Sequence, residues 1–231
     1  MKKLLSKGIE KIKILNSTNN ELPIVISIAH SGQYLTANMY DNLKKDIILP
    51  NMDWYLPELY SFFEEQGFTT IINNISRYVI DPNRRLEEEC IDDSYINTFI
   101  YTKTTFGKEM YKKDIDIEEI NSDIILGNDE GKTTSGIFIE FIKSLLEKQD
   151  FAVNCNEQYK GGYITKHYSK KIEGCEALQI ELSYQTYIDE RKFGEEEFPS
   201  INKIVFKKTQ SRMRKCFIEL KQVLLEQYKT E

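Results

Sequence analysis

Histidine is scarce in this chain of 231 residues, which contains only His30 and His167. A metal site that uses imidazole can therefore draw at most two imidazole ligands from this chain. The four cysteines include no Cys-x-x-Cys pair, which argues against a zinc knuckle of thiolates. We expect all four thiols to be reduced and unrelated, as is usual in the cytoplasm.

Long apolar runs and excess positive charge are also missing. The longest apolar runs, such as the one at 23–29, are far shorter than the stretch of roughly 20 residues that a membrane helix needs. The basic segment 1–13 lacks the apolar core of a signal peptide, so we expect a cytoplasmic protein with no membrane partner. Lys and Arg number 31 against 37 Asp and Glu, a net charge of −6, which gives no electrostatic attraction to nucleic acid.

The residues that are present favour one α/β domain over residues 1–231, with residues 1–21 as an N-terminal arm or an early β-ribbon. A β-branched run at 23–29 and a second run at 68–72 predict buried strands, and the apolar stripe at 53–66 predicts a helix that ends at Gly67. This order implies a parallel crossover, and hence a mostly parallel or mixed sheet flanked by helices. Further elements are expected at 137–148 (helix), 151–154 (strand), 159–168 (aromatic loop), 177–182 (strand) and 199–228 (helix).

Polar residues follow or close three of the expected strands. His30 follows the first strand, Arg77, Asp81, Asn83 and Arg84 follow the second, and Glu181 stands in the last. If the carboxyl ends of these strands meet at one edge, the set suits metal-assisted hydrolysis of an anionic substrate.

Ordinary structural roles remain open for each of these residues. A lone histidine after a strand is more often a hydrogen-bonded residue than a ligand, and a glutamate at a strand end is more often a solvated charge than a base. Arg84 and Arg85 could equally form surface ion pairs with the acidic run at 87–89.

Several blocks in order along the chain resemble the N-formylglutamate amidohydrolase family. The first three are Pro23-Ile-Val-Ile-Ser-Ile-Ala-His30-Ser-Gly32, Asp53-Trp-Tyr-Leu-Pro-Glu-Leu-Tyr60 and Ser76-Arg-Tyr-Val-Ile-Asp-Pro-Asn-Arg84. Later blocks are Thr104-Thr-Phe-Gly107, Asp123-Ile-Ile-Leu-Gly127, Asn154 with the glycine-rich run 159–168, and Ala177-Leu-Gln-Ile-Glu-Leu182 followed by 187–190. The ordered set is specific, although each block alone is weak.

This resemblance implies a phosphorylase/hydrolase-like fold, similar to that of zinc carboxypeptidases and aspartoacylases. It implies hydrolysis of an N-formyl or N-acyl acidic amino acid, such as N-formylglutamate or a related small amide, with zinc or another divalent metal. His30 and Asp53 would bind the metal, and Glu181 would be the general base. The residues expected to contact the substrate are Arg77, Asn83, Arg84, Gly161, Gly162 and Tyr163.

The chain also departs from the family pattern. A Pro-Tyr-His helix motif and a central Asp-x-His-Ser strand end, which would supply a further metal ligand, are absent around residues 120–122. Either the chain has lost this piece or the sequence omits an internal stretch. Two functions therefore remain open: a zinc-dependent amidohydrolase, or a catalytically impaired relative that binds a small anionic ligand. The oligomeric state is also open.

Overall fold

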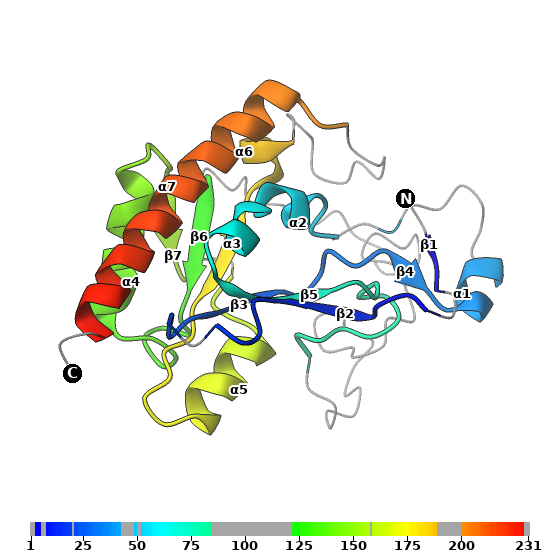
Figure 1. Cartoon of the computed structure of the whole chain (residues 1–231), viewed down its shortest axis with the longest axis horizontal. Helices are drawn as coiled ribbons and strands as arrows, with labels where there is room; N and C mark the ends of the chain where they lie inside the picture. The colour runs from blue at the N-terminus through cyan, green and yellow to red at the C-terminus, as the bar shows by residue number, and fades with distance from the viewer. Residues whose placement is uncertain are drawn as a thin grey trace, which may run out of the picture. The chain divides into compact units, whose positions relative to one another are not determined.

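The computed structural model describes residues 3–5, 8–19, 21–42, 49, 52–84, 122–157, 159–188 and 200–228. The chain divides into two compact units (Figure 1). The first comprises Met1–Asn20, Ile24–Glu118 and Lys192–Phe198, and the second comprises Glu21–Pro23, Glu119–Arg191 and Pro199–Glu231. The single domain over residues 1–231 stays a prediction.

A three-stranded sheet forms the centre of the first unit, in the order β2-β5-β3. Strands β3 (Val25–Ile28) and β5 (Thr69–Asn73) are parallel, which confirms the expected crossover. Strand β2 (Ile12–Leu15), from the expected arm, pairs antiparallel with β5. A separate parallel pair joins β1 (Lys3–Leu4) to β4 (Tyr34–Leu35), and α1 (Ala37–Asn42) follows β4.

The crossover between β3 and β5 contains two short helices, α2 (Leu56–Leu59) and α3 (Phe62–Glu65), instead of the single helix expected at 53–66. Tyr60 leaves the helical conformation at the end of α2, and its ring stacks on Phe63 with centroids 4.9 Å apart. Aromatic packing thus accompanies the break, which hydrophobic spacing alone does not reveal. Gly67 follows α3 with a φ of 79°, as expected for a glycine that ends a helix.

The second unit has its own mixed sheet in the order β7-β6-β8. The central strand β6 (Ile124–Gly127) pairs parallel with β7 (Val153–Cys155) and antiparallel with β8 (Gln179–Leu182). Two mixed sheets with helices agree with the expected α/β class. The remaining elements of this unit are α4 (Gly136–Glu147), α5 (Tyr163–Lys171), α6 (Tyr184–Tyr187) and α7 (Lys203–Tyr228).

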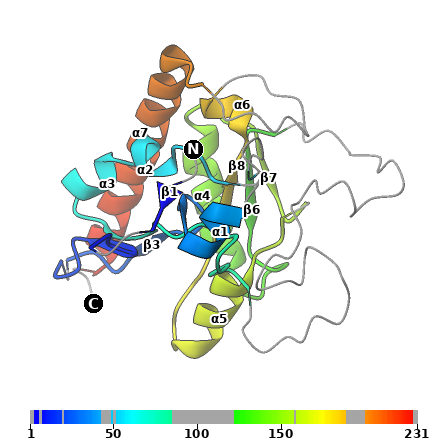
Figure 2. The ribbon, with the colours of Figure 1, turned by 90° about the vertical axis from the view of Figure 1, so that its right-hand side faces the viewer.

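Helix α5 occupies most of the run at 159–168 that was expected to be a loop, so that expectation was wrong. The helix begins after Gly162 and has few apolar residues, with only Thr165 fully buried. In both views of the ribbon, α5 and α6 lie at opposite ends of this unit's sheet (Figures 1 and 2).

The core of the second unit lies between β6 and the helices α4 and α7. All four residues of β6 are buried, and α4 buries Ile139, Ile142, Leu145 and Leu146 against the sheet side. Helix α7 buries Met213, Phe217 and Leu220, whereas Ile204 near its beginning is 82% exposed. Among the described residues no helix is both long and apolar enough to cross a membrane.

Cys216 is a buried thiol between α7 and α4. Its Sγ donates a hydrogen bond to the carbonyl oxygen of Leu145 at 3.1 Å. Burial raises the pKa of this thiol to about 11. The other two described cysteines, Cys155 and Cys175, are also free.

Gly32 allows a close backbone approach after β3. A Cβ at this position would lie 2.2 Å from the carbonyl oxygen of Ile75 and 2.4 Å from the carbonyl carbon of Asn74. The segment after β5 would have to move to admit any side chain. Only glycine fits there, which fixes the path of the chain that follows His30.

We predict that Gly32→Ala lowers the free energy of unfolding by about 2–3 kcal/mol, because overpacking against backbone cannot be relieved by a rotamer change. Urea unfolding followed by circular dichroism measures this difference. Gly136→Ala is the matched control, since a Cβ at Gly136 meets nothing within 4 Å. Equal stability of the two variants would contradict the close-approach interpretation.

Candidate functional site

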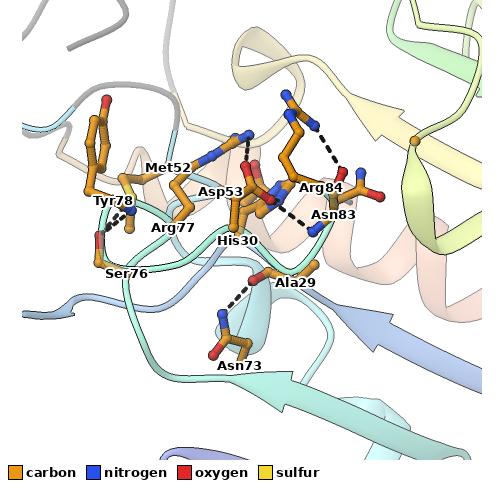
Figure 3. Close-up of polar contacts among 12 residues, drawn as sticks. Ala29, His30, Met52, Asp53, Asn73, Ser76, Arg77, Tyr78, Asn83 and Arg84 are labelled. Carbon is orange, nitrogen blue, oxygen red and sulfur yellow. Dashed lines mark hydrogen bonds and ion pairs between the residues drawn. The ribbon is translucent and has the colours of Figure 1, made fainter. Parts of the chain in front are cut away.

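The carboxyl ends of β3 and β5 are fastened together by the side chain of Asn73. Its Nδ2 donates to the carbonyl oxygens of Ala29 and Ile75, each at 2.9 Å, and its Oδ1 accepts from the Ile75 N–H at 3.1 Å. The residues that follow the two strands therefore begin side by side, as parallel strand ends should. Figure 3 shows the polar side chains that gather there.

His30 lies between the carboxylates of Asp53 and Asp81. Its Nε2 is 2.8 Å from Oδ1 of Asp81, and its Nδ1 is 3.7 Å from Oδ2 of Asp53. The Asp53 N–H also donates to the His30 carbonyl oxygen at 3.2 Å, which holds residue 53 beside the end of β3. The structure thus brings together the two residues that were predicted to bind a metal.

Asp81 is the buried centre of this group, with a side chain that is 0% exposed. Its Oδ2 accepts from Nη2 of Arg77 at 2.8 Å, and its Oδ1 accepts from the backbone N–H of Asn83 at 2.8 Å. Because a carboxylate accepts hydrogen bonds, the contact assigns the His30 proton to Nε2. In a neutral imidazole with this tautomer, the Nδ1 lone pair is directed to the Asp53 side.

The gap between Nδ1 of His30 and Asp53 has the size of a shared cation site. The two atoms are 3.7 Å apart, which is too far for a good hydrogen bond. Two ligands at about 2.0–2.1 Å from a tetrahedral zinc would be roughly 3.4 Å apart. A histidine whose second nitrogen is fixed by a carboxylate is the common arrangement of a metal-binding imidazole. The donor set therefore fits a divalent cation, with two side chains as ligands.

The described residues contain no group of three or more His, Cys, Asp or Glu side chains suited to one metal ion. Further ligands would have to come from water, the substrate or other parts of the chain. Several predicted features lie outside the described residues, namely Arg85, the run at 87–89, the Thr104-Thr-Phe-Gly107 block and residues 189–190.

The three residues predicted to bind the substrate in this unit occupy different positions. Arg77 is buried and paired with Asp81, so it holds that carboxylate in place. Asn83 contributes its N–H to Asp81, and its carbonyl oxygen accepts from Nη1 of Arg84 at 3.0 Å. The buried Nε of Arg84 has no hydrogen-bond partner in the described part of the chain.

The remaining predicted residues belong to the second unit. Glu181 is half-buried in β8, and its Oε1 accepts a hydrogen bond from Nε2 of Gln179. The Gly162 N–H donates to Oε1 of Gln179 at 2.7 Å. Gly161 has a φ of 120°, and the hydroxyl of Tyr163 lies 3.1 Å from Nδ1 of His167. Because β8 runs antiparallel to β6, the argument from parallel strand ends does not reach Glu181, and one pocket shared with His30 stays a prediction.

Two residues, one in each unit, make contacts that were not assigned from the sequence. Asp81 was noted only as one of several polar residues, yet it joins His30, Arg77 and Asn83. Its spacing of four from Arg77 was an available signal. Gln179 contacts Glu181 through the period of two that the strand prediction already implied.

Comparison with known proteins identifies relatives along most of the chain. The N-formylglutamate amidohydrolase family matches residues 22–124 and 118–188. The N-formylglutamate deformylase of Pseudomonas putida is 25% identical, with 77% of this chain and 86% of the relative covered. The enzyme of the same name from Pseudomonas aeruginosa is also 25% identical, with 78% and 87% covered.

A solved structure shares the fold. The crystal structure of N-formylglutamate amidohydrolase from Ralstonia eutropha JMP134 superposes with a TM-score of 0.72 at 16% identity, and covers 94% of this chain and 98% of that one. The relatives define the class of protein as a hydrolase. The chain belongs to the N-formylglutamate amidohydrolase family.

The same comparisons bear on the absent Asp-x-His-Ser segment. The family match consists of two pieces that overlap at residues 118–124. The segment missing from the sequence pattern would lie at this position. The alignment with the Pseudomonas putida enzyme is as long as this whole chain but takes in only 77% of it. Nearly a quarter of the aligned positions therefore face no residue of this chain.

We predict that Asp81→Asn lowers the free energy of unfolding by about 3–5 kcal/mol, because it leaves the buried Arg77 guanidinium without its counter-charge. Glu219→Gln is the control, since it removes only an exposed ion pair with Lys148. That loss should cost less than about 1 kcal/mol. Guanidinium chloride unfolding measures both variants, and an equally small loss for Asp81→Asn would show that Asp81 is not the centre of the group.

Proposed function

We propose that this protein hydrolyses the formyl amide of N-formylglutamate, or of a closely related N-acyl acidic amino acid, with the help of zinc or another divalent metal. The proposal is supported by the family match and by the names of the two Pseudomonas relatives. The observation that carries it is the His30 ring, with one nitrogen fixed by buried Asp81 and the other turned to Asp53.

His30 and Asp53 would hold the metal, and Asp81 would keep the His30 ring in the correct orientation and tautomer. When bound, a zinc ion supplies a water of lowered pKa and a Lewis acid for the formyl carbonyl. The zinc carboxypeptidase-like character of the site is part of this proposal.

The chain's own residues divide the remaining tasks. Glu181 takes a proton from the attacking water and returns it to the amine nitrogen as the C–N bond breaks, so that water and the amide give formate and glutamate. Arg84 and Asn83 hold a carboxylate of the substrate, for which the unpartnered Arg84 Nε is suited. Gly161, Gly162 and Tyr163 line the approach of the substrate to Glu181.

We expect purified protein with added zinc to hydrolyse N-formylglutamate, and Glu181→Gln to lower kcat by about 10²–10⁴, the usual contribution of a general base. Release of glutamate is measured over a panel of N-formyl and N-acyl acidic amino acids. Glu173→Gln, in the exposed turn that follows α5, is the control and should keep wild-type turnover. Turnover that survives Glu181→Gln unchanged would refute the role of the base.

We expect Arg84→Ala to lower kcat/KM by about ten- to a hundredfold, since a hydrogen bond between charged groups contributes about 1.5–3 kcal/mol. Its melting temperature should remain close to that of the wild type. A variant that mainly loses thermal stability would instead assign Arg84 to surface ion pairing.

We expect His30→Ala to abolish stoichiometric zinc binding, and Asp81→Asn to weaken it by about 10–100-fold, as loss of a carboxylate behind a histidine ligand does. Isothermal titration calorimetry and metal analysis of the dialysed protein measure this independently of activity. Unaltered zinc content in His30→Ala would remove His30 from the ligand set.

A second candidate function is a catalytically impaired relative that binds a small anionic ligand. The break in the family match at 118–124 and the unmatched positions of the Pseudomonas putida alignment favour it, because the absent segment would carry a metal ligand. Binding of N-formylglutamate without turnover, in a preparation whose intact mass matches the printed sequence, would favour this candidate over the first.

A further inference from the structure

Strand β8 presents two polar side chains, Gln179 and Glu181, on the same face of its sheet. Their register partners on β6 are Gly127 and Ile125. The Gln179 amide contacts both the Glu181 carboxylate, through Nε2, and the Gly162 N–H, through Oε1. Because an N–H can only donate and a carboxylate can only accept, these two contacts permit one orientation of the amide.

The Gly162 peptide that fixes this orientation is itself held in place. The loop before α5 lies against Gly127, where a Cβ would be 2.8 Å from the Gly161 nitrogen and from the Tyr159 carbonyl oxygen. In the next peptide unit, the Gly162 carbonyl oxygen accepts from Oγ1 of Thr165 at 3.0 Å and from the Lys166 N–H at 3.2 Å. The glycine-rich loop is therefore a rigid support for the Gln179 side chain.

We propose that Gln179 is a positioning residue for Glu181: its amide transmits the fixed position of the Gly162 N–H to the carboxylate and holds that carboxylate for proton transfer. The proposal rests on the proposed function only in taking Glu181 as the base. In this proposal Gly162 helps to orient the base through its N–H, and it also lies where the substrate approaches. Gln179 acts through Glu181 and does not need to touch the substrate.

The hydrogen bond has a measurable effect on the carboxyl group. A donor to the ionised form favours ionisation, so removal of the Gln179 amide should raise the pKa of Glu181. Other titratable groups in this part of the unit are Asp123, whose carbonyl oxygen accepts from the Ser183 N–H after β8, and Glu157, which bonds to Asn154. Tyr163 and His167 lie on α5. All of them remain in the variants below, so a comparison with the wild type isolates Gln179.

Two substitutions separate positioning from mere structural support. Gln179→Met preserves the length of the side chain and loses both hydrogen bonds. Gln179→Glu retains an oxygen that accepts from the Gly162 N–H but replaces the donor to Glu181 with a second carboxyl oxygen. A structural role predicts that folded Gln179→Met keeps the turnover of the wild type, whereas the positioning role predicts that it loses turnover. Gln179→Glu loses the donor and also adds a like charge beside Glu181, so the positioning role predicts a larger loss there.

The test combines ¹³C NMR titration of the Glu181 carboxyl, assigned with Glu181→Gln, and steady-state kinetics with N-formylglutamate. We expect the pKa of Glu181 to rise by about one unit in Gln179→Met, and kcat to fall at least tenfold in both variants while KM changes little. Thr165→Val is the control, because it removes a hydrogen bond to the Gly162 carbonyl oxygen and changes neither Gln179 nor Glu181. It should leave the pKa of Glu181 unchanged.

An unchanged pKa of Glu181 in Gln179→Met, or wild-type kcat in Gln179→Glu, would overturn the proposal. If Gln179→Met does not fold, the uncharged Gln179→Leu takes its place, since it also loses both hydrogen bonds and adds no charge beside Glu181. Wild-type protein that fails to hydrolyse any substrate would refute the proposed reaction, and the carboxyl titration would still decide the role of Gln179.

Discussion

The carboxylate of Asp81, entirely removed from solvent, is the interaction on which the polar group of the first unit depends. Burial of an unpaired carboxylate costs several kcal/mol. Here the cost is offset by an imidazole N–H, a guanidinium and a backbone N–H, from His30, Arg77 and Asn83. These donors come from segments that follow two neighbouring strands, so one charge fixes the end of β3 to the loop after β5. The hydrogen bond to Asp81 therefore fixes the orientation of the His30 ring for any reaction in which His30 takes part.

In the second unit, the loop before α5 is held by backbone contacts and by a neutral side chain. Gly127 lets the loop before α5 approach the end of β6, and the Gly162 N–H then meets a neutral side chain, Gln179. Such an arrangement is hard to find in a sequence, because glutamine carries no charge and its period-two relation to Glu181 is shared by many strand residues. The gathering of His30 with Asp81 and Arg77, in contrast, could be predicted, since parallel strands bring their carboxyl ends together.

The elements that could be predicted are those with a strong hydrophobic period. Strands β3 and β5 and helices α4 and α7 follow from apolar runs and stripes, and the Ser135 cap of α4 follows from its hydroxyl. Three features could not be predicted for physical reasons. An alternating pattern does not reveal the direction of β8. The break at Tyr60 is accompanied by aromatic packing that a hydrophobic stripe does not show, and α5 lacks an apolar face because most of it contacts solvent.

The buried thiol of Cys216 gives the second unit an internal reporter of its own opening. With a pKa of about 11, only about one thiol in 10⁴ is a thiolate at neutral pH, and the thiolate is the form that alkylating agents and oxidants attack. While Sγ remains hydrogen-bonded to the Leu145 carbonyl oxygen between α7 and α4, the thiol therefore reacts very slowly with these reagents. The rate at which this thiol becomes reactive would measure how often the two helices separate, independently of global unfolding.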